Sequence, residues 1–199
     1  GPRAVAVAPD GTVWASDTGN QSVVSWDALL STKKTFGRSG AGPGDFSGPV
    51  GIAASSSAIY VADVGNHRIQ VLAPSGQFRT AWPFPGWKQW GEAHLETDGN
   101  RVYAADPGGN AVLAFDTAGK VLERWTAGES GRPFSRPAGL ALDAKAQLLY
   151  VVNSGDNSVA RIDLSRARIS RESLPKGAAR GILGEIFATA FSDPRRGEP

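Results

Sequence analysis

An internal repeat of about 45 residues constrains this 199-residue chain more than any other feature of its sequence. Four segments align with one another: TVWASDTGNQSVVSWD from Thr12, AIYVADVGNHRIQVLA from Ala58, RVYAADPGGNAVLAFD from Arg101 and LLYVVNSGDNSVARID from Leu148. We call their equivalent polar residues the marker positions: Asp17, Asp63, Asp106 and Asn153. Prolines 2, 49 and 137 give a second register mark ahead of three of the units. Such a period indicates a repeat architecture built from one supersecondary unit.

Each unit consists of short segments with the alternating pattern of β-strands. First strands are expected near residues 4–8, 51–54 and 138–142, and second strands end at the marker positions. Third strands follow at 23–26, 68–72, 111–115 and 158–162, and fourth strands at 33–36, 78–82 and 121–125 close the first three units. Four strands per unit predict an all-β fold, a β-propeller of four recognisable four-stranded blades. The blades span about residues 2–48, 49–91, 92–136 and 137–164.

The amino-acid sequence of the repeat resembles the NHL family. YVADVGNHRIQVLAPSGQF, residues 60–78, is close to the NHL consensus, and FGRSGAGPGDFSGPVGIA, residues 36–53, matches its connector between blades. The fourth unit is more similar to the YVTN-type repeats of surface proteins. The resemblance implies a propeller that can belong to a larger ring of about six blades. It also implies a range of tasks, among them protein docking, sensing, RNA binding and, in some relatives, lyase or lactonase chemistry.

Composition agrees with an all-β chain and excludes thiol chemistry. The 25 glycines and 13 prolines favour short elements joined by tight turns, and the absence of cysteine excludes disulfides and thiolate metal sites. No apolar run is long enough to span a membrane. The absence of methionine, an initiator included, indicates a processed chain or a fragment. The bacterial proteins that the chain resembles lead us to expect an extracytoplasmic location.

The turns that follow the marker residues are expected to be structural rather than cation-binding. An Asp side chain accepts backbone hydrogen bonds, Gly supplies a positive φ, and Asn tolerates a left-handed conformation. The two histidines, His67 and His94, are too few and too dissimilar in position for a zinc site. We therefore predict no metal and no cofactor.

Candidate partner-binding residues gather on one predicted face. In a propeller, the turn after the second strand and the connector after the fourth lie at the same end of each blade. The second connector is rich in aromatic residues; Trp82 and Trp90 are assigned to packing, Trp90 as a buried plug equivalent to Phe46 and Phe134. The binding candidates are Phe84, Trp87, Lys88, His67, Arg68, Arg38 and Arg132.

Mixed charge at this end, where Asp45 and Glu129 are also expected, suits a protein partner better than a nucleic acid. The leading hypothesis is a non-catalytic binding or scaffold module within a larger assembly. The alternatives are a propeller lyase or hydrolase with a central metal site and a single-stranded RNA-binding NHL domain.

Residues 165–199 lose the repeat and form a basic extension. From Leu164 onward seven Lys or Arg residues stand against four Asp or Glu residues, a net charge of +3. A short amphipathic helix is predicted at about 178–191, with an apolar docking face of Ile182, Leu183, Ile186, Phe187 and Phe191. Four blades would leave two sheet faces uncovered, so we expect further blades, a second copy, a partner protein or this tail to cover them. Membrane contact is expected only through a partner or the tail.

Overall fold

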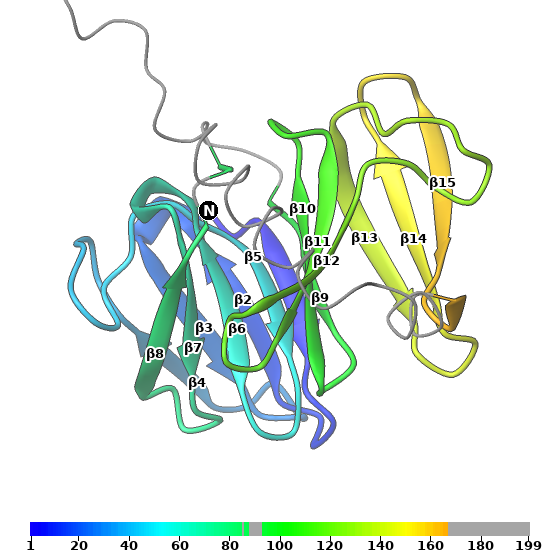
Figure 1. Cartoon of the computed structure of the whole chain (residues 1–199). Helices are drawn as coiled ribbons and strands as arrows, with labels where there is room; N and C mark the ends of the chain where they lie inside the picture. The colour runs from blue at the N-terminus through cyan, green and yellow to red at the C-terminus, as the bar shows by residue number, and fades with distance from the viewer. Residues whose placement is uncertain (85, 88–92, 167–199) are drawn as a thin grey trace, which may run out of the picture. The chain divides into compact units, whose positions relative to one another are not determined.

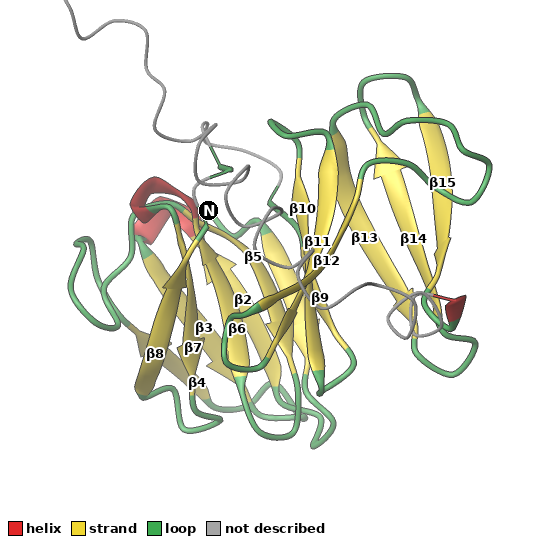
Figure 2. Cartoon of the chain, in the orientation of Figure 1, coloured by secondary structure: helices red, strands yellow, loops and turns green. Residues whose placement is uncertain are grey.

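The computed structural model describes residues 1–84, 86–87 and 93–166. Strands occupy about half of this part of the chain, which also contains two single-turn 3₁₀ helices, η1 (Thr18–Asn20) and η2 (Val64–Asn66) (Figures 1 and 2). The predicted helix at 178–191 and its docking face lie outside the described residues. Among the residues that the structure describes, no helix has the length and apolar character needed to cross a membrane.

The strands form four separate antiparallel sheets, each made from consecutive strands. The first blade contains β1 (Ala4–Val7), β2 (Val13–Asp17), β3 (Ser22–Trp26) and β4 (Lys33–Phe36). The second contains β5 (Pro49–Ala54), β6 (Ile59–Asp63), β7 (Arg68–Leu72) and β8 (Phe78–Pro83). The third contains β9 (Leu95–Thr97), β10 (Arg101–Asp106), β11 (Ala111–Asp116) and β12 (Val121–Trp125). The fourth contains β13 (Pro137–Asp143), β14 (Leu148–Asn153) and β15 (Ser158–Asp163).

The predicted fold class is confirmed: the chain is an all-β, four-bladed propeller. Three blades have four strands, and the fourth has three among the described residues, in agreement with the absence of a fourth-strand pattern there. The blades lie within one compact unit, residues 1–162. The second unit begins at Asp163, and its described residues include an ion pair between Asp163 Oδ2 and Arg166 Nε at 3.2 Å.

Successive blades pack face to face because the inner strands of each blade carry apolar residues on the faces that meet. The first strands meet in chain order, β1 with β5, β5 with β9 and β9 with β13 (Figure 1). We call the face that a blade turns toward the preceding blade its leading face, and the opposite face its trailing face. The cores lie between them: the trailing residue Trp14 packs with the leading residues Ile52 and Ile59, and Tyr60 packs with Leu95 and Val102.

An aromatic pair recurs on the trailing faces of the first three blades. One ring comes from the second strand and the other from the fourth or its end, and their centroids lie 5.4 to 6.5 Å apart. The pairs are Trp14 with Phe36, Tyr60 with Trp82, and Tyr103 with Trp125. Rings at these separations add favourable contact energy to the area that they bury. The predicted packing role of Trp82 is confirmed, since this side chain is buried.

Candidate functional site

The turn after the second strand of blade two is built around one buried carboxylate. Asp63 is fully buried and accepts hydrogen bonds from the Asn66 amide (2.8 Å), the Arg68 Nε (2.8 Å), the Gln70 amide (2.9 Å) and the backbone N–H of Ser47 (2.7 Å). A buried carboxylate is tolerated because its oxygens are fully engaged by donors, one of them a cation. The expectation that this turn is structural agrees with its geometry.

The same turn clamps the connector that precedes it. Arg68 donates to the carbonyl oxygens of Ala41 (2.9 Å), Gly42 (2.8 Å) and Asp45 (2.9 Å). Asn66 donates to the Gly40 carbonyl at 2.9 Å. Arg68, predicted as a partner-binding residue, therefore has its guanidinium committed to holding the loop in place.

The conformational roles predicted for Gly and Asn in these turns are partly wrong. In the first two blades the residue with the positive φ is the one after the asparagine, Gln21 (φ 54°) and His67 (φ 52°). The glycines of these turns do not have a positive φ. Glycine is required at position 65 for close approach, because a Cβ there would lie 2.6 Å from the carbonyl oxygen of Ser47. That carbonyl accepts the Gly65 N–H at 2.7 Å. The glycine thus lets the turn and the connector touch backbone to backbone.

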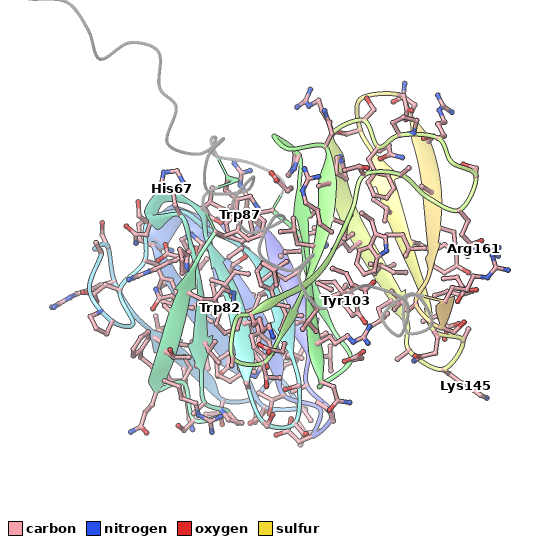
Figure 3. All side chains as sticks on the ribbon, viewed as in Figure 1. His67, Trp82, Trp87, Tyr103, Lys145 and Arg161 are labelled. Atoms are coloured by element: carbon pink, nitrogen blue, oxygen red, sulfur yellow. The ribbon has the colours of Figure 1, made fainter. Side chains whose placement is uncertain are left out.

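Phe84 and Trp87, the aromatic binding candidates, are buried rather than exposed. Their rings stack with centroids 4.0 Å apart, and the Trp87 indole N–H donates to the Ala105 carbonyl at 2.9 Å. In the view of Figure 3, Trp87 lies below His67. The expectation that these rings are accessible is wrong, because the indole finds both an apolar core and an acceptor for its N–H. Lys88 and Trp90 lie outside the described residues.

The aromatic plugs predicted for the other two connectors are confirmed. Phe46 is fully buried, and its backbone N–H donates to the Arg38 carbonyl at 2.8 Å. Phe134 is buried, and its N–H donates to the Thr126 carbonyl at 2.7 Å. In the second connector, Phe84 and Trp87 belong to the core between blades two and three.

Three of the predicted binding residues are exposed at the connector end of the blades. Arg38 and Arg132 have side chains that are 84% and 64% exposed, and His67 is exposed in its left-handed turn. Arg38 pairs with Asp45 at 3.3 Å, and Arg132 pairs with Asp156 at 3.0 Å. We name this surface, formed by Arg38, Asp45, His67, Arg132 and Asp156, the connector face. Its cations stand beside acids, so its charge is mixed.

Hydrogen bonds between turns and connectors hold the connector face. The Phe84 N–H donates to the His67 carbonyl at 2.7 Å, and the Arg136 N–H donates to the Asn110 side chain at 2.8 Å. The Gly155 N–H donates to the Ser135 carbonyl at 3.0 Å. Each turn is thereby tied to a neighbouring connector, so the exposed charges stand on a braced surface.

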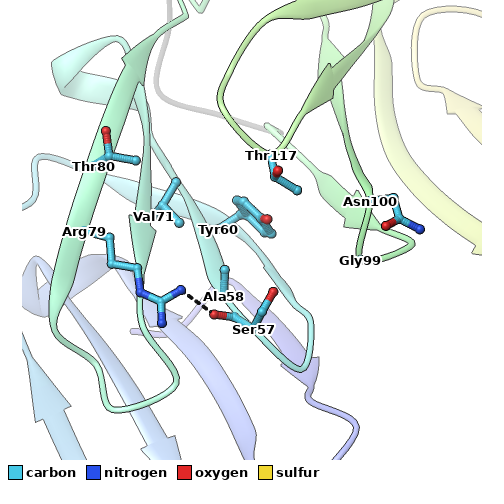
Figure 4. Close-up of a pocket in the computed structure, with 9 residues that line it drawn as sticks. All are labelled: Ser57, Ala58, Tyr60, Val71, Arg79, Thr80, Gly99, Asn100 and Thr117. Atoms are coloured by element: carbon cyan, nitrogen blue, oxygen red, sulfur yellow. Dashed lines mark hydrogen bonds between the residues drawn. The ribbon is translucent and has the colours of Figure 1, made fainter.

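A cavity of about 390 Å³ lies at the opposite end of the blades, between blades two and three (Figure 4). Arg79 crosses its rim and donates to the Ser57 carbonyl at 2.6 Å. A cavity of about 80 Å³ lies at the repeat-equivalent place between blades one and two. The residues that line the larger cavity are Ser57, Ala58, Tyr60, Val71, Arg79, Thr80, Gly99, Asn100 and Thr117. The sequence prediction did not identify it, because the small side chains that leave it open come from different blades.

Two titratable residues stand close together near the start of blade three. Burial raises the pKa of the Glu96 carboxyl to about 7, with partial compensation from a backbone hydrogen bond at Thr97. Burial also lowers the pKa of His94, whose Nδ1 is enclosed without a hydrogen-bond partner among the described residues. Residues two apart in an extended chain point to the same side. Perturbed groups of this kind are typical of functional sites, although ordinary cores contain them too.

The described residues contain no group of three or more His, Cys, Asp or Glu side chains that could hold a metal ion.

The sheets, their face-to-face packing and the repeated turns define this chain as a β-propeller protein. Its second blade contains an NHL repeat: residues 46–72 match that family. The match covers the carboxylate-centred turn and the end of the connector that it clamps. No curated protein matches the chain.

Solved propeller structures resemble the chain in fold at low sequence identity. Hydrazine synthase of Kuenenia stuttgartiensis is 18% identical with a TM-score of 0.65, over 84% of this chain and 47% of that one. A chain of a nidogen/laminin complex is 18% identical with a TM-score of 0.64, over 82% and 61%. Virginiamycin B lyase of Staphylococcus aureus is 14% identical with a TM-score of 0.59, over 80% and 50%. The chain thus spans about half to three fifths of these relatives, which include enzymes and a binding complex.

Proposed function

We propose that this chain is a non-catalytic binding module that holds a protein partner against its connector face, as part of a larger assembly. One observation carries the proposal: exposed arginines, each paired with a partly buried acid, stand on loops that the blades brace through hydrogen bonds. A surface fixed before binding loses little conformational freedom when a partner arrives. Mixed charge specifies orientation and partner choice, whereas phosphate backbones require an excess of cations.

Two resemblances support this proposal. The fold is similar to a chain of a nidogen/laminin complex, which is a protein–protein assembly. The fourth unit resembles YVTN-type repeats of surface proteins, which supports an extracytoplasmic place of action.

The test compares charge reversal at the two ends of the blades. The connector-face variant carries Arg38→Glu and Arg132→Glu, and the control carries Lys120→Glu and Lys145→Glu, which are also exposed. Figure 3 shows Lys145 at the opposite end from His67. Proteins cross-linked to each tagged variant in the source organism's extract are identified and quantified. A specific partner that the control retains and the connector-face variant loses supports the proposal; equal capture by both variants contradicts it.

A second candidate function is catalysis by a propeller lyase or hydrolase. The presence of Glu96 and His94 two residues apart favours it, because a carboxyl with a pKa near 7 and a neutral imidazole are suited to proton transfer. Titration calorimetry of the wild type and of Glu96→Gln with Mg²⁺ and Mn²⁺ tests for a central metal site. Binding that the substitution abolishes supports this candidate, and the absence of heat in the wild type counts against it.

A further inference from the structure

The leading face of the first blade carries the apolar pattern that the other blades bury. In each blade, one residue of the first strand pairs with the residue that stands two positions before the marker on the second strand. These equivalent first-strand residues are Val5, Ile52, Leu95 and Leu140. The last three are 2–6% exposed, because each packs toward the preceding blade. Val5 is 65% exposed, and Val7 beside it on the same face is 64% exposed. Among the residues that the structure describes, nothing covers this face, which has the pattern of one half of a blade–blade interface.

The trailing face of the fourth blade presents the other half. The residue three before the marker is aromatic in all four blades: Trp14, Tyr60, Tyr103 and Tyr150. The first three are 1% exposed, whereas Tyr150 is 38% exposed. Val152 on the same strand and Val159 on β15 are also exposed, at 47% and 67%. Large exposed apolar groups gathered on one sheet face mark an interaction surface.

We propose that a second copy of this chain occupies these faces, with the leading face of its first blade packed on the trailing face of the fourth blade. The argument is the continuity of an interface that the chain forms three times, between blades one and two, two and three, and three and four. The first two junctions join a trailing aromatic residue to a leading aliphatic one, and at the third the trailing Tyr103 and the leading Leu140 are both buried. At Val5, Tyr150 and Val159 the exposed faces carry residues of the same kind as their buried equivalents in the other blades, so every copy offers both complements.

Such a contact is head-to-tail: it uses two different surfaces and leaves one of each free after the first association. Two copies close on themselves only when the rotation between them permits, and otherwise the association continues to larger species. A contact of one sheet face is at the small end of specific interfaces, so we expect a dissociation constant of about 10–100 µM. The surface is separate from the connector face, so the inference does not depend on the proposed function.

The experiment measures the mass of the full chain by sedimentation velocity and light scattering from about 1 to 200 µM, a range that brackets the expected constant. The wild type should rise above its monomer mass of 20.8 kDa as concentration increases. Val5→Lys and Val152→Lys each place a charge in one half of the interface and should weaken association about tenfold or more. The control is Leu29→Lys, in a turn of the first blade where the side chain is 87% exposed, and it should associate as the wild type does.

A mixture of the two single variants distinguishes this arrangement from general stickiness. The Val5→Lys chain keeps its fourth-blade face, and the Val152→Lys chain keeps its first-blade face. Together they have one intact interface, so the mixture should form a one-to-one complex that grows no further.

Near-native thermal unfolding of each variant shows that the exposed substitutions leave the fold intact. A wild-type chain that stays monomeric to 200 µM, association that survives Val5→Lys, or a mixture that forms no complex would each overturn the inference.

Discussion

The buried carboxylate of Asp63 provides the sharpest test of how this propeller holds its loops. Asp63→Ala removes the acceptor of four hydrogen bonds, two of which come from the Arg68 Nε at 2.8 Å and the Gln70 amide at 2.9 Å. The Arg68 side chain is 18% exposed, so its charge would lose its partner in a mostly buried place. The connector that Arg68 clamps would lose support at the same time.

The magnitude follows from the number and kind of groups left unpaired. Breaking a buried ion pair by removing one partner costs about 3–5 kcal/mol, because the remaining charge is uncompensated. Partial access of Arg68 to water limits that cost, and the stranded amide donors add to it. We therefore expect Asp63→Ala to lower the free energy of unfolding by about 3–5 kcal/mol.

Asp17 is the matched control, because it occupies the same marker position in blade one with a poorer network. Its Oδ2 accepts from the Asn20 amide at 2.8 Å, and its Oδ1 has no hydrogen-bond partner in the described part of the chain. Asp17→Ala should cost about 1 kcal/mol, the value of one ordinary hydrogen bond.

Urea unfolding followed by tryptophan fluorescence measures both variants at a concentration where the chain is monomeric. An unchanged dependence on urea would show that the variants differ from the wild type in stability alone. Equal losses for Asp17→Ala and Asp63→Ala would refute the reasoning, because the repeat position and not the network would then set the cost.

Two further predictions concern the core and the inner strand. Trp87→Phe should lower stability by about 1–3 kcal/mol, because the Ala105 carbonyl loses its buried donor, and an unchanged urea midpoint would show that this ring does not support the fold. Glu96→Gln should remove a pH dependence. Because burial raises the pKa of Glu96 to about 7, the folded state favours its protonated form. The contribution of Glu96 to stability is therefore full below pH 4.5 and falls by about 2 kcal/mol, allowing for partial exposure, as pH rises through 7. Thermal unfolding from pH 4 to 8 should show this slope in the wild type and not in the variant; parallel curves would exclude the assignment.

The repeat made the fold predictable because the alternation of residue types within each strand indicates which side chains lie on which face of the sheet. Alternation with a period of two places Val61 and Ile59 on one side of β6 and Tyr60 on the other, whatever the rest of the chain does. The marker residues then show how the blades align with one another. The glycines after them recur because the turns and connectors approach each other closely, as at Gly65 and Gly155. Local pattern therefore carries the architecture.

The candidate site was less predictable, because exposure depends on partners that are distant in sequence. An indole at position 87 is buried only because β10 offers the Ala105 carbonyl and the core beside it has room. Arg68 resembles a free surface cation in the sequence, yet the carbonyls of the preceding connector occupy its donors. Nothing in the sequence around Glu96 indicates its raised pKa, because the cause is burial in the folded chain, which a backbone hydrogen bond at Thr97 offsets only in part.

The packing between blades connects self-association to the stability of the fold. A second copy that covers Val5 and Tyr150 binds only folded chains, so association adds to the free energy of unfolding as concentration rises. The connector face gains no contact from that association, because it lies at the ends of the blades and not on their sheet faces. A partner on the connector face and a second copy on the open sheet faces can therefore bind the same chain at once, and charge reversal at Arg38 should leave the concentration dependence of mass unchanged.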